Sequence, residues 1–158
     1  RWLFEIEMPR VQVVVHPQSV IHSIVEFVDG SMLAQLSAPD MCLPIQYALT
    51  YPERISSDRV QTNLTDLCRL DFEEPDEGRF ASLKLARRAG EIGGTLPAVL
   101  NAANEMAVES FCNGEISFTN ITETVALVMD SHQVVKNPTL EEIFAADAWA
   151  RTSALTSA

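Results

Sequence analysis

The sequence lacks the motifs that would place it at once in a functional class. No apolar run in its 158 residues approaches the roughly 20 residues that a membrane-spanning helix needs. It has no G-x-G-x-x-G fingerprint and no P-loop, so we expect no phosphate cradle within this chain. It also has no G-x-S-x-G elbow, the turn that exposes a nucleophilic serine. These absences count against membrane, dinucleotide-binding and serine-hydrolase functions for the chain by itself.

Basic residues are scarce. The chain has 11 Lys and Arg against 22 Asp and Glu, which gives a net charge of -11. A nucleic-acid backbone or an anionic membrane surface is bound by a basic face. We therefore expect neither a nucleic acid nor a membrane among the partners.

Cysteines are also few. Cys42, Cys68 and Cys112 are far apart and form no C-x-x-C pair, which indicates free thiols in a reducing cytoplasm. No secretory signal opens the chain, because Glu5 and Glu7 interrupt the first apolar stretch. The chain starts "RWLFEIEMPR" without an initiator Met, and we expect it to be a piece of a longer protein.

What is present is the composition of a globular protein, 47% apolar and 21% charged. The β-branched run "VQVVVH" at 11–16 predicts a buried strand. Residues 20–37 predict a β-hairpin closed by a two-residue turn at Asp29-Gly30. That register sets Val25 opposite Ala34, and it sets His22 opposite Ser37 on a mixed face. A short helix is expected from Pro44 to Pro52, and a short strand at 69–72.

The second half of the chain predicts helices. We expect them at 78–94, 95–114, 120–132 and 139–158. Thr95 is expected to cap the second helix, and the pairs Asn120–Glu123 and Thr139–Glu142 are spaced as capping boxes. The predicted fold class is α+β: a small, mostly antiparallel sheet with a short helix, followed by a four-helix C-terminal bundle. The acidic stretch near residue 76 divides the predicted domains, 1–75 and 76–158.

His16 and His22 suggest two kinds of chemistry. With Glu26 or Asp40 they could bind a metal, but Pro17 breaks the strand between them and the spacing is not that of known zinc sites. We favour histidines at the edge of a core, hydrogen-bonded to backbone. His132 is expected in the last turn of a helix, where a partly charged imidazole suits the helix dipole.

The segment "LNAANE" places Asn101, Asn104 and Glu105 on neighbouring turns of one helix. Amides are poor residues for a helix interior unless they make hydrogen bonds. Bonds to another helix or to a loop are the favoured interpretation, and a ligand contact is the alternative.

Several long motifs occur in one order: "RWLF", "VHPQSVIHSIVEFVDGSMLAQLSAPDM", "LPIQYALTYPER", "LDFEEPD", "LKLARRAG", "GGTLPAVLNAANEMAVESF" and "ISFTNI". Together they resemble the C-terminal part of the 1-deoxy-D-xylulose 5-phosphate reductoisomerase family, from Arg1 to about Trp149. Enzymes of that family act in the non-mevalonate isoprenoid pathway.

The resemblance implies an enzyme with an N-terminal NADPH domain, a central catalytic domain and a C-terminal helical domain. It implies a homodimer that pairs through the sheet region and uses Mg²⁺ or Mn²⁺. Such an enzyme rearranges its substrate and then reduces the aldehyde with NADPH to 2-C-methyl-D-erythritol 4-phosphate.

Residue by residue, little of the active site is implied for this chain. His22 matches an active-site neighbour, while Pro39 and Met41 in "APDM" match residues packed on the nicotinamide side. Cys42 stands where the family often has arginine. The family's metal carboxylates, phosphate-binding residues and NADPH domain lie upstream of the motifs seen here. We therefore expect no complete catalytic set, no metal ligands and no tightly bound cofactor in this chain alone.

Two functions follow as expectations. The favoured one is part of an NADPH-dependent reductoisomerase whose missing N-terminal portion carries most of the chemistry, so that the isolated chain is inactive. The alternative is a stand-alone dimerisation or scaffold module without catalysis.

Overall fold

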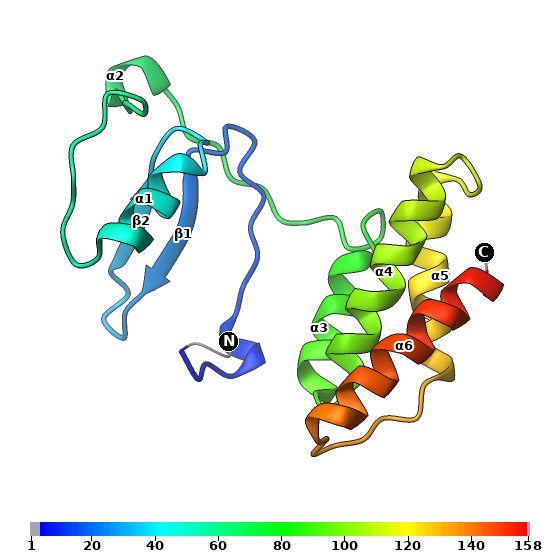
Figure 1. Cartoon of the computed structure of the whole chain (residues 1–158). Coiled ribbons are helices and arrows are strands. Elements are labelled where there is room, and N and C mark those ends of the chain that lie inside the picture. Colours follow the sequence, from blue (N-terminus) through cyan, green and yellow to red (C-terminus); the bar gives the residue numbers. More distant parts are fainter. Residues whose placement is uncertain (1–3, 158) are drawn as a thin grey trace. The chain divides into compact units, whose positions relative to one another are not determined.

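The computed structural model describes residues 4–157, which form two compact units (Figure 1). Residues 13–75 make up the first, here called the sheet unit. Residues 4–12 and 76–157 make up the second, here called the helical unit. The N-terminal segment thus groups with the helices, although the sequence analysis assigned it to the sheet domain.

The sheet unit is built on a two-stranded antiparallel sheet, β1 (Ile21–Glu26) and β2 (Met32–Leu36). The Gly30 N–H donates to the Phe27 carbonyl at 3.0 Å, and Gly30 has a φ of +82°. A turn of this kind followed by a left-handed glycine is a three-residue hairpin loop. The predicted two-residue turn is therefore wrong.

The additional loop residue moves the strand register by one. Val25 lies opposite Leu33 rather than Ala34, and Glu26 lies opposite Met32. An irregularity between Ile21 and Ser23 leaves His22 at a bulge. Because a one-residue shift exchanges the partners of every side chain, the predicted division into an apolar and a mixed face also fails.

The strand predicted at 11–16 is wrong as well. Within the described residues this segment makes a single isolated bridge, between Val15 and Glu73, and the strand expected at 69–72 does not form. Val13, Val14 and Val15 are exposed. An apolar run becomes a buried strand only where a sheet covers both of its faces, and the sheet unit supplies no such cover.

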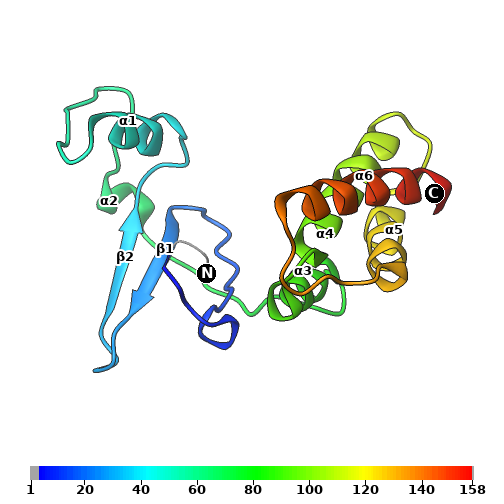
Figure 2. The same cartoon turned by 60° about the horizontal axis from the view of Figure 1, so that its bottom comes forward.

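Two helices complete the sheet unit. They are α1 (Cys42–Thr50) and α2 (Leu64–Leu67). The predicted 44–52 helix corresponds to α1, which follows the end of β2 (Figure 2). The Asn63 side chain accepts the Thr65 N–H at 3.1 Å and so caps α2.

The helical unit contains a short 3-10 helix and four α-helices. Their bounds are η1 (Met8–Arg10), α3 (Ser82–Ile92), α4 (Leu96–Cys112), α5 (Phe118–Ser131) and α6 (Leu140–Ser157). In this unit α4 packs against α3, α5 and α6, as Figure 1 shows. The segment around η1 packs on α3, where a Cβ on Gly90 would lie 2.8 Å from the Met8 sulfur.

Small side chains let α4 and α6 approach closely. Ala103 and Ala107 of α4 are buried, as are Ala146, Ala150 and Ala154 of α6. Residues four apart form one ridge on a helix surface, so each helix presents a ridge of alanines. Larger core residues fill the remaining space, namely Leu96, Val99, Val128 and Met129.

Helix ends show which capping predictions hold. The Thr139–Glu142 box is confirmed, because the Thr139 N–H donates to Glu142 at 2.8 Å and the Glu142 N–H donates to Thr139 at 3.2 Å. The Asn120 box is wrong, since Ser117 is the N-cap of α5 and Asn120 lies inside the helix. No helix in the described range 4–157 is long and apolar enough to cross a membrane.

Candidate functional site

The base of the hairpin is closed by Ser37. Its N–H donates to the Val20 carbonyl at 3.0 Å, and both residues are buried. This bond extends the pairing of the strands past the bulge at His22. The chain that leaves β2 therefore starts from a fixed point.

His22, Gln35 and Ser37 form a polar triangle at this end. His22 Nδ1 lies 3.3 Å from Gln35 Oε1 and 3.4 Å from Ser37 Oγ, and the Gln35 amide donates to Ser37 Oγ at 3.3 Å. His22 and Ser37 thus meet, as the sequence analysis expected, although through a different register. The other ring nitrogen of His22, Nε2, makes no hydrogen bond within the described part of the chain. The triangle holds one edge of an exposed imidazole and leaves the other edge accessible.

Residues 38–41, here called the APDM loop, are tied at three places. The Asp40 N–H donates to the Ala38 carbonyl at 2.8 Å, and the Cys42 N–H donates to Asp40 Oδ1 at 2.8 Å. The Ala38 N–H donates to Thr62 Oγ1 at 2.9 Å. The loop is therefore a defined turn into α1, on which the Met41 side chain is 71% exposed.

Electrostatics in this loop follow from the same bonds. The hydrogen bond from the Cys42 backbone lowers the pKa of Asp40, because it stabilises the carboxylate. The interaction with Asp40 raises the pKa of the Cys42 thiol. Cys42 is thus held as a neutral thiol beside an ionised carboxylate, which does not favour a nucleophilic cysteine.

His16 belongs to a second cluster in the sheet unit. Its Nδ1 lies 2.7 Å from the Asp71 carbonyl, and its ring stacks on Phe72 with centroids 4.8 Å apart. Gln18 donates to the Asp71 carboxylate at 2.6 Å. The backbone-bonded histidine that the sequence analysis favoured is confirmed for His16. Its contacts with residues some 55 positions away carried no signal in the sequence.

No metal site is formed by the two histidines. Within residues 4–157, no three His, Cys, Asp or Glu residues lie close enough together to hold a metal ion. A divalent cation takes several oxygen or nitrogen ligands at short range. The side chains described here therefore do not fit a magnesium or manganese ion.

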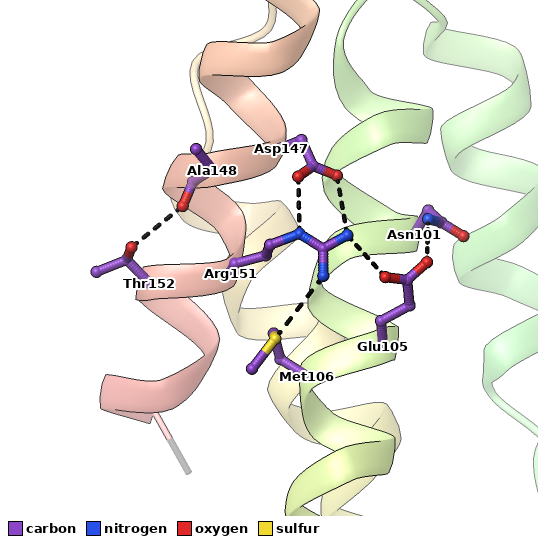
Figure 3. Close-up of polar contacts among 7 residues, drawn as sticks. All are labelled: Asn101, Glu105, Met106, Asp147, Ala148, Arg151 and Thr152. Carbon is purple, nitrogen blue, oxygen red and sulfur yellow. Dashed lines mark hydrogen bonds and ion pairs between the residues drawn. The ribbon is translucent and has the colours of Figure 1, made fainter.

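The polar segment of α4 forms a network with α6 (Figure 3). Asn101 donates to Glu105 at 2.8 Å, and Arg151 of α6 bonds both Glu105 and Asp147 at 2.7 Å. Hydrogen bonding from Arg151 lowers the pKa of Glu105. The favoured interpretation is confirmed for Glu105, which bonds another helix, whereas Asn101 bonds Glu105 within its own helix. No spacing in the sequence indicated Arg151, which lies 46 residues from Glu105.

A cavity of about 470 Å³ opens at the other end of the helical unit. Thr95, His132, Glu142 and Trp149 are among its lining residues. Thr95 is fully buried: its hydroxyl lies 2.7 Å from His132 Nε2 and accepts the Val135 N–H at 3.1 Å. Thr95 occupies the N-cap of α4 but does not cap it with its side chain.

The structure differs in two ways from what the sequence predicted for His132. It follows α5 as the C-cap rather than lying in the last turn. Burial lowers its pKa, because desolvation disfavours the charged ring. The predicted stabilisation of a partly charged imidazole by the helix dipole is therefore not what governs this residue.

Comparison with known proteins gives one consistent family. Residues 36–153 match the model of the DXP reductoisomerase C-terminal domain. The 1-deoxy-D-xylulose 5-phosphate reductoisomerase of Desulforamulus reducens is 56% identical over 154 residues, covering 98% of this chain and 40% of that protein. The enzyme of Symbiobacterium thermophilum is 56% identical over 153 residues, covering 97% of this chain and 40% of that protein.

Solved structures agree. The reductoisomerase from Zymomonas mobilis in complex with NADPH is 43% identical, with a TM-score of 0.90 over 98% of this chain and 41% of that one. A DOX-P reductoisomerase in complex with NADPH, fosmidomycin and magnesium, also 43% identical, has a TM-score of 0.91 over 98% of this chain and 40% of that one. The chain spans about 40% of the length of its curated relatives. It belongs to the DXP reductoisomerase family, and residues 36–153 are its counterpart of that family's C-terminal domain.

Proposed function

We propose that this chain works as part of an NADPH-dependent reductoisomerase that converts 1-deoxy-D-xylulose 5-phosphate into 2-C-methyl-D-erythritol 4-phosphate. The observation that carries the proposal is the likeness, over 98% of the chain, to a reductoisomerase solved in complex with NADPH. At 43% identity and a TM-score of 0.90, both sequence and backbone support a shared activity. The proteins named above are all reductoisomerases, so they lend no support to a stand-alone scaffold.

The APDM loop is proposed as one side of the nicotinamide pocket. When bound, NADPH supplies the hydride. Pro39 and Met41 would pack against the ring, and a flexible thioether suits contact with a planar ring. The exposure of Met41 and the three hydrogen bonds of the loop support this role. His22 would orient the loop through Ser37 rather than transfer a proton.

The divalent metal of the enzyme is proposed to take its ligands from outside this chain. Residues 4–157 hold no group of side chains that fits the ion. The role of this chain is therefore to shape the pocket, and the isolated chain is proposed to be inactive.

The helical unit is proposed as a supporting domain. In this proposal residues 76–158 are a four-helix domain within the C-terminal region that the family model covers, and residues 1–75 complete the catalytic domain, with the segment at 4–12 packed on the helices. Support comes from the division of contacts near residue 76 and from the shared core of α3 to α6.

A homodimer through the sheet unit is proposed as well. Val25, Phe27, Val28, Met32 and Leu33 of the hairpin are all exposed. A two-stranded sheet is at best marginally stable alone, and a second subunit would cover such apolar side chains.

The test uses the full-length enzyme that contains this chain. Met41→Ala is expected to raise the KM for NADPH by about tenfold, as the loss of roughly 1–2 kcal/mol of apolar contact would. Leu49→Ala is the matched control, because Leu49 is an exposed apolar residue of α1. The assay follows the oxidation of NADPH with 1-deoxy-D-xylulose 5-phosphate as substrate. A wild-type enzyme that does not turn over this substrate, or a Met41→Ala enzyme with unchanged KM, contradicts the proposal.

A further inference from the structure

The APDM loop receives one tie from a distant part of the chain. The hydrogen bonds that the Asp40 and Cys42 N–H groups donate lie within local turns. The Ala38 N–H instead bonds Thr62, which lies 24 residues further along the chain. Strand β2 ends at Leu36, so the Ala38 N–H has no ladder partner and is free to bond a side chain. Thr62 Oγ1 is its acceptor.

The segment that carries Thr62 is itself fixed on both sides. The Gln46 side chain of α1 donates to the Ile55 carbonyl at 2.8 Å, and the Thr50 hydroxyl donates to the Glu53 carbonyl at 2.9 Å. On the other side Asn63 caps α2. Thr62 therefore presents its hydroxyl from a segment that is anchored before and after it.

We propose that Thr62 is a positioning residue for the APDM loop, and that through Ala38 it sets where Pro39 and Met41 lie. Within residues 4–157 its hydroxyl oxygen accepts the Ala38 N–H, so it acts on Pro39 and Met41 through the backbone of the loop. The functional half of this inference rests on the proposed function, because it takes Met41 to contact the nicotinamide.

Two substitutions separate the hydroxyl from the shape of the side chain. Thr62→Val keeps the branched shape and removes the acceptor, while Thr62→Ser keeps the acceptor. Thr152→Val is the matched control, because it removes a side chain-to-backbone bond of 3.1 Å from the helical unit without touching Ala38 or the segment that carries Thr62. All three variants are studied in the full-length enzyme.

The first measurement is amide hydrogen exchange at Ala38, which needs no activity. Thr62→Val is expected to speed this exchange about tenfold, since the amide loses its acceptor. Thr62→Ser and Thr152→Val should leave it near the wild-type rate. Unchanged exchange in Thr62→Val would overturn the positioning role, whether or not the enzyme uses NADPH.

The second measurement determines kcat and the KM for NADPH separately. Thr62→Val is expected to raise the KM for NADPH roughly three- to tenfold with kcat within about twofold, because binding is weakened equally before and during the reaction. Thr62→Ser should restore the KM. Faster exchange at Ala38 with an unchanged KM would overturn the link from Thr62 to the cofactor. An inactive wild-type enzyme would instead contradict the proposed function, and the exchange result would still decide whether Thr62 holds the loop.

Discussion

At Gly94 the chain turns into α4 with a φ of +59°, and the Val135 carbonyl lies directly against it. A Cβ at this position would be 2.1 Å from that oxygen. Gly94→Ala is therefore expected to lower the free energy of unfolding by more than about 2 kcal/mol, from the left-handed backbone and the clash together. Urea unfolding of the wild type and the variant measures this difference.

Gly114→Ala provides the matched comparison. Gly114 also has a positive φ, +76°, but a Cβ there would meet nothing within 4 Å. Gly114→Ala should therefore lower the free energy of unfolding only through its left-handed backbone, by about 1 kcal/mol. Equal costs for the two variants would show that the Val135 contact does not constrain Gly94.

Single residues were predictable where the signal is local. The box formed by Thr139 and Glu142 was readable because both partners lie within one turn. At Asn120 the same spacing misled, because Ser117 adopts an extended conformation and starts α5 earlier. The partner of Glu105 was not predictable, since Arg151 comes to it only through the packing of α6 on α4.

At the scale of elements, His132 links the start of α4 to the end of α5. Thr95 accepts the Val135 N–H and its hydroxyl lies 2.7 Å from His132 Nε2. A neutral ring with its proton on Nδ1 can accept the Thr95 hydroxyl hydrogen at Nε2, whereas a protonated ring cannot. Folding lowers the pKa of His132 through burial. The native state therefore favours the neutral ring.

This linkage predicts how stability depends on pH. A histidine with a lowered native pKa contributes fully above its unfolded pKa of about 6.5, and the contribution is lost as the pH falls from there toward the native value. The free energy of unfolding should fall between about pH 7.5 and pH 5.5 by more in the wild type than in His132→Gln, which supplies an acceptor without titrating. The free energies of unfolding are measured by urea unfolding at each pH. An equal pH dependence in the wild type and in His132→Gln would contradict the link.

The hairpin shows how far an element can be predicted. Its existence and its turn region were evident from the sequence around Asp29 and Gly30, but its register was not. Both a two-residue and a three-residue loop accept Asp-Gly, and only the Gly30 N–H to Phe27 contact distinguishes them. The position of the APDM loop near His22 was predictable, because both lie at the same end of the hairpin. Its hydrogen bond to Thr62 was not, because Thr62 lies 24 residues beyond Ala38.

At the scale of the whole molecule, the exposed hairpin predicts self-association. Sedimentation at tens of micromolar, about the range where interfaces of standard size hold, should give a species near 2 × 17.5 kDa. Leu33→Lys should shift it toward the monomer, because a charge would replace one of the exposed apolar side chains of the hairpin. Leu49→Lys places the same charge on α1 as a control. A clean wild-type monomer, or equal effects of the two variants, would count against pairing through the sheet.

Metal binding is a second property of the whole chain. Calorimetric titration of the chain with Mn²⁺ should show only weak binding, because residues 4–157 provide no set of three clustered ligands. Micromolar one-to-one binding would show that the chain carries a site of its own.

The grouping of the N-terminal segment with the helices was not predictable from composition. It depends on Met8 meeting Gly90, a contact between residues on either side of the whole sheet unit. Sequence patterns report neighbours within a turn or a hairpin, and a contact of this range has no periodic signature.

That grouping also sets an order of events at the ribosome. Residues 4–12 leave the exit tunnel before the sheet unit, but α3, against which η1 packs, is synthesised only after residues 13–75. At about 5–20 residues per second, the early segment waits on the order of ten seconds for its partner. The helical unit is therefore completed after the sheet unit although part of it is made before the sheet unit, and Gly90 can meet Met8 only once it has emerged.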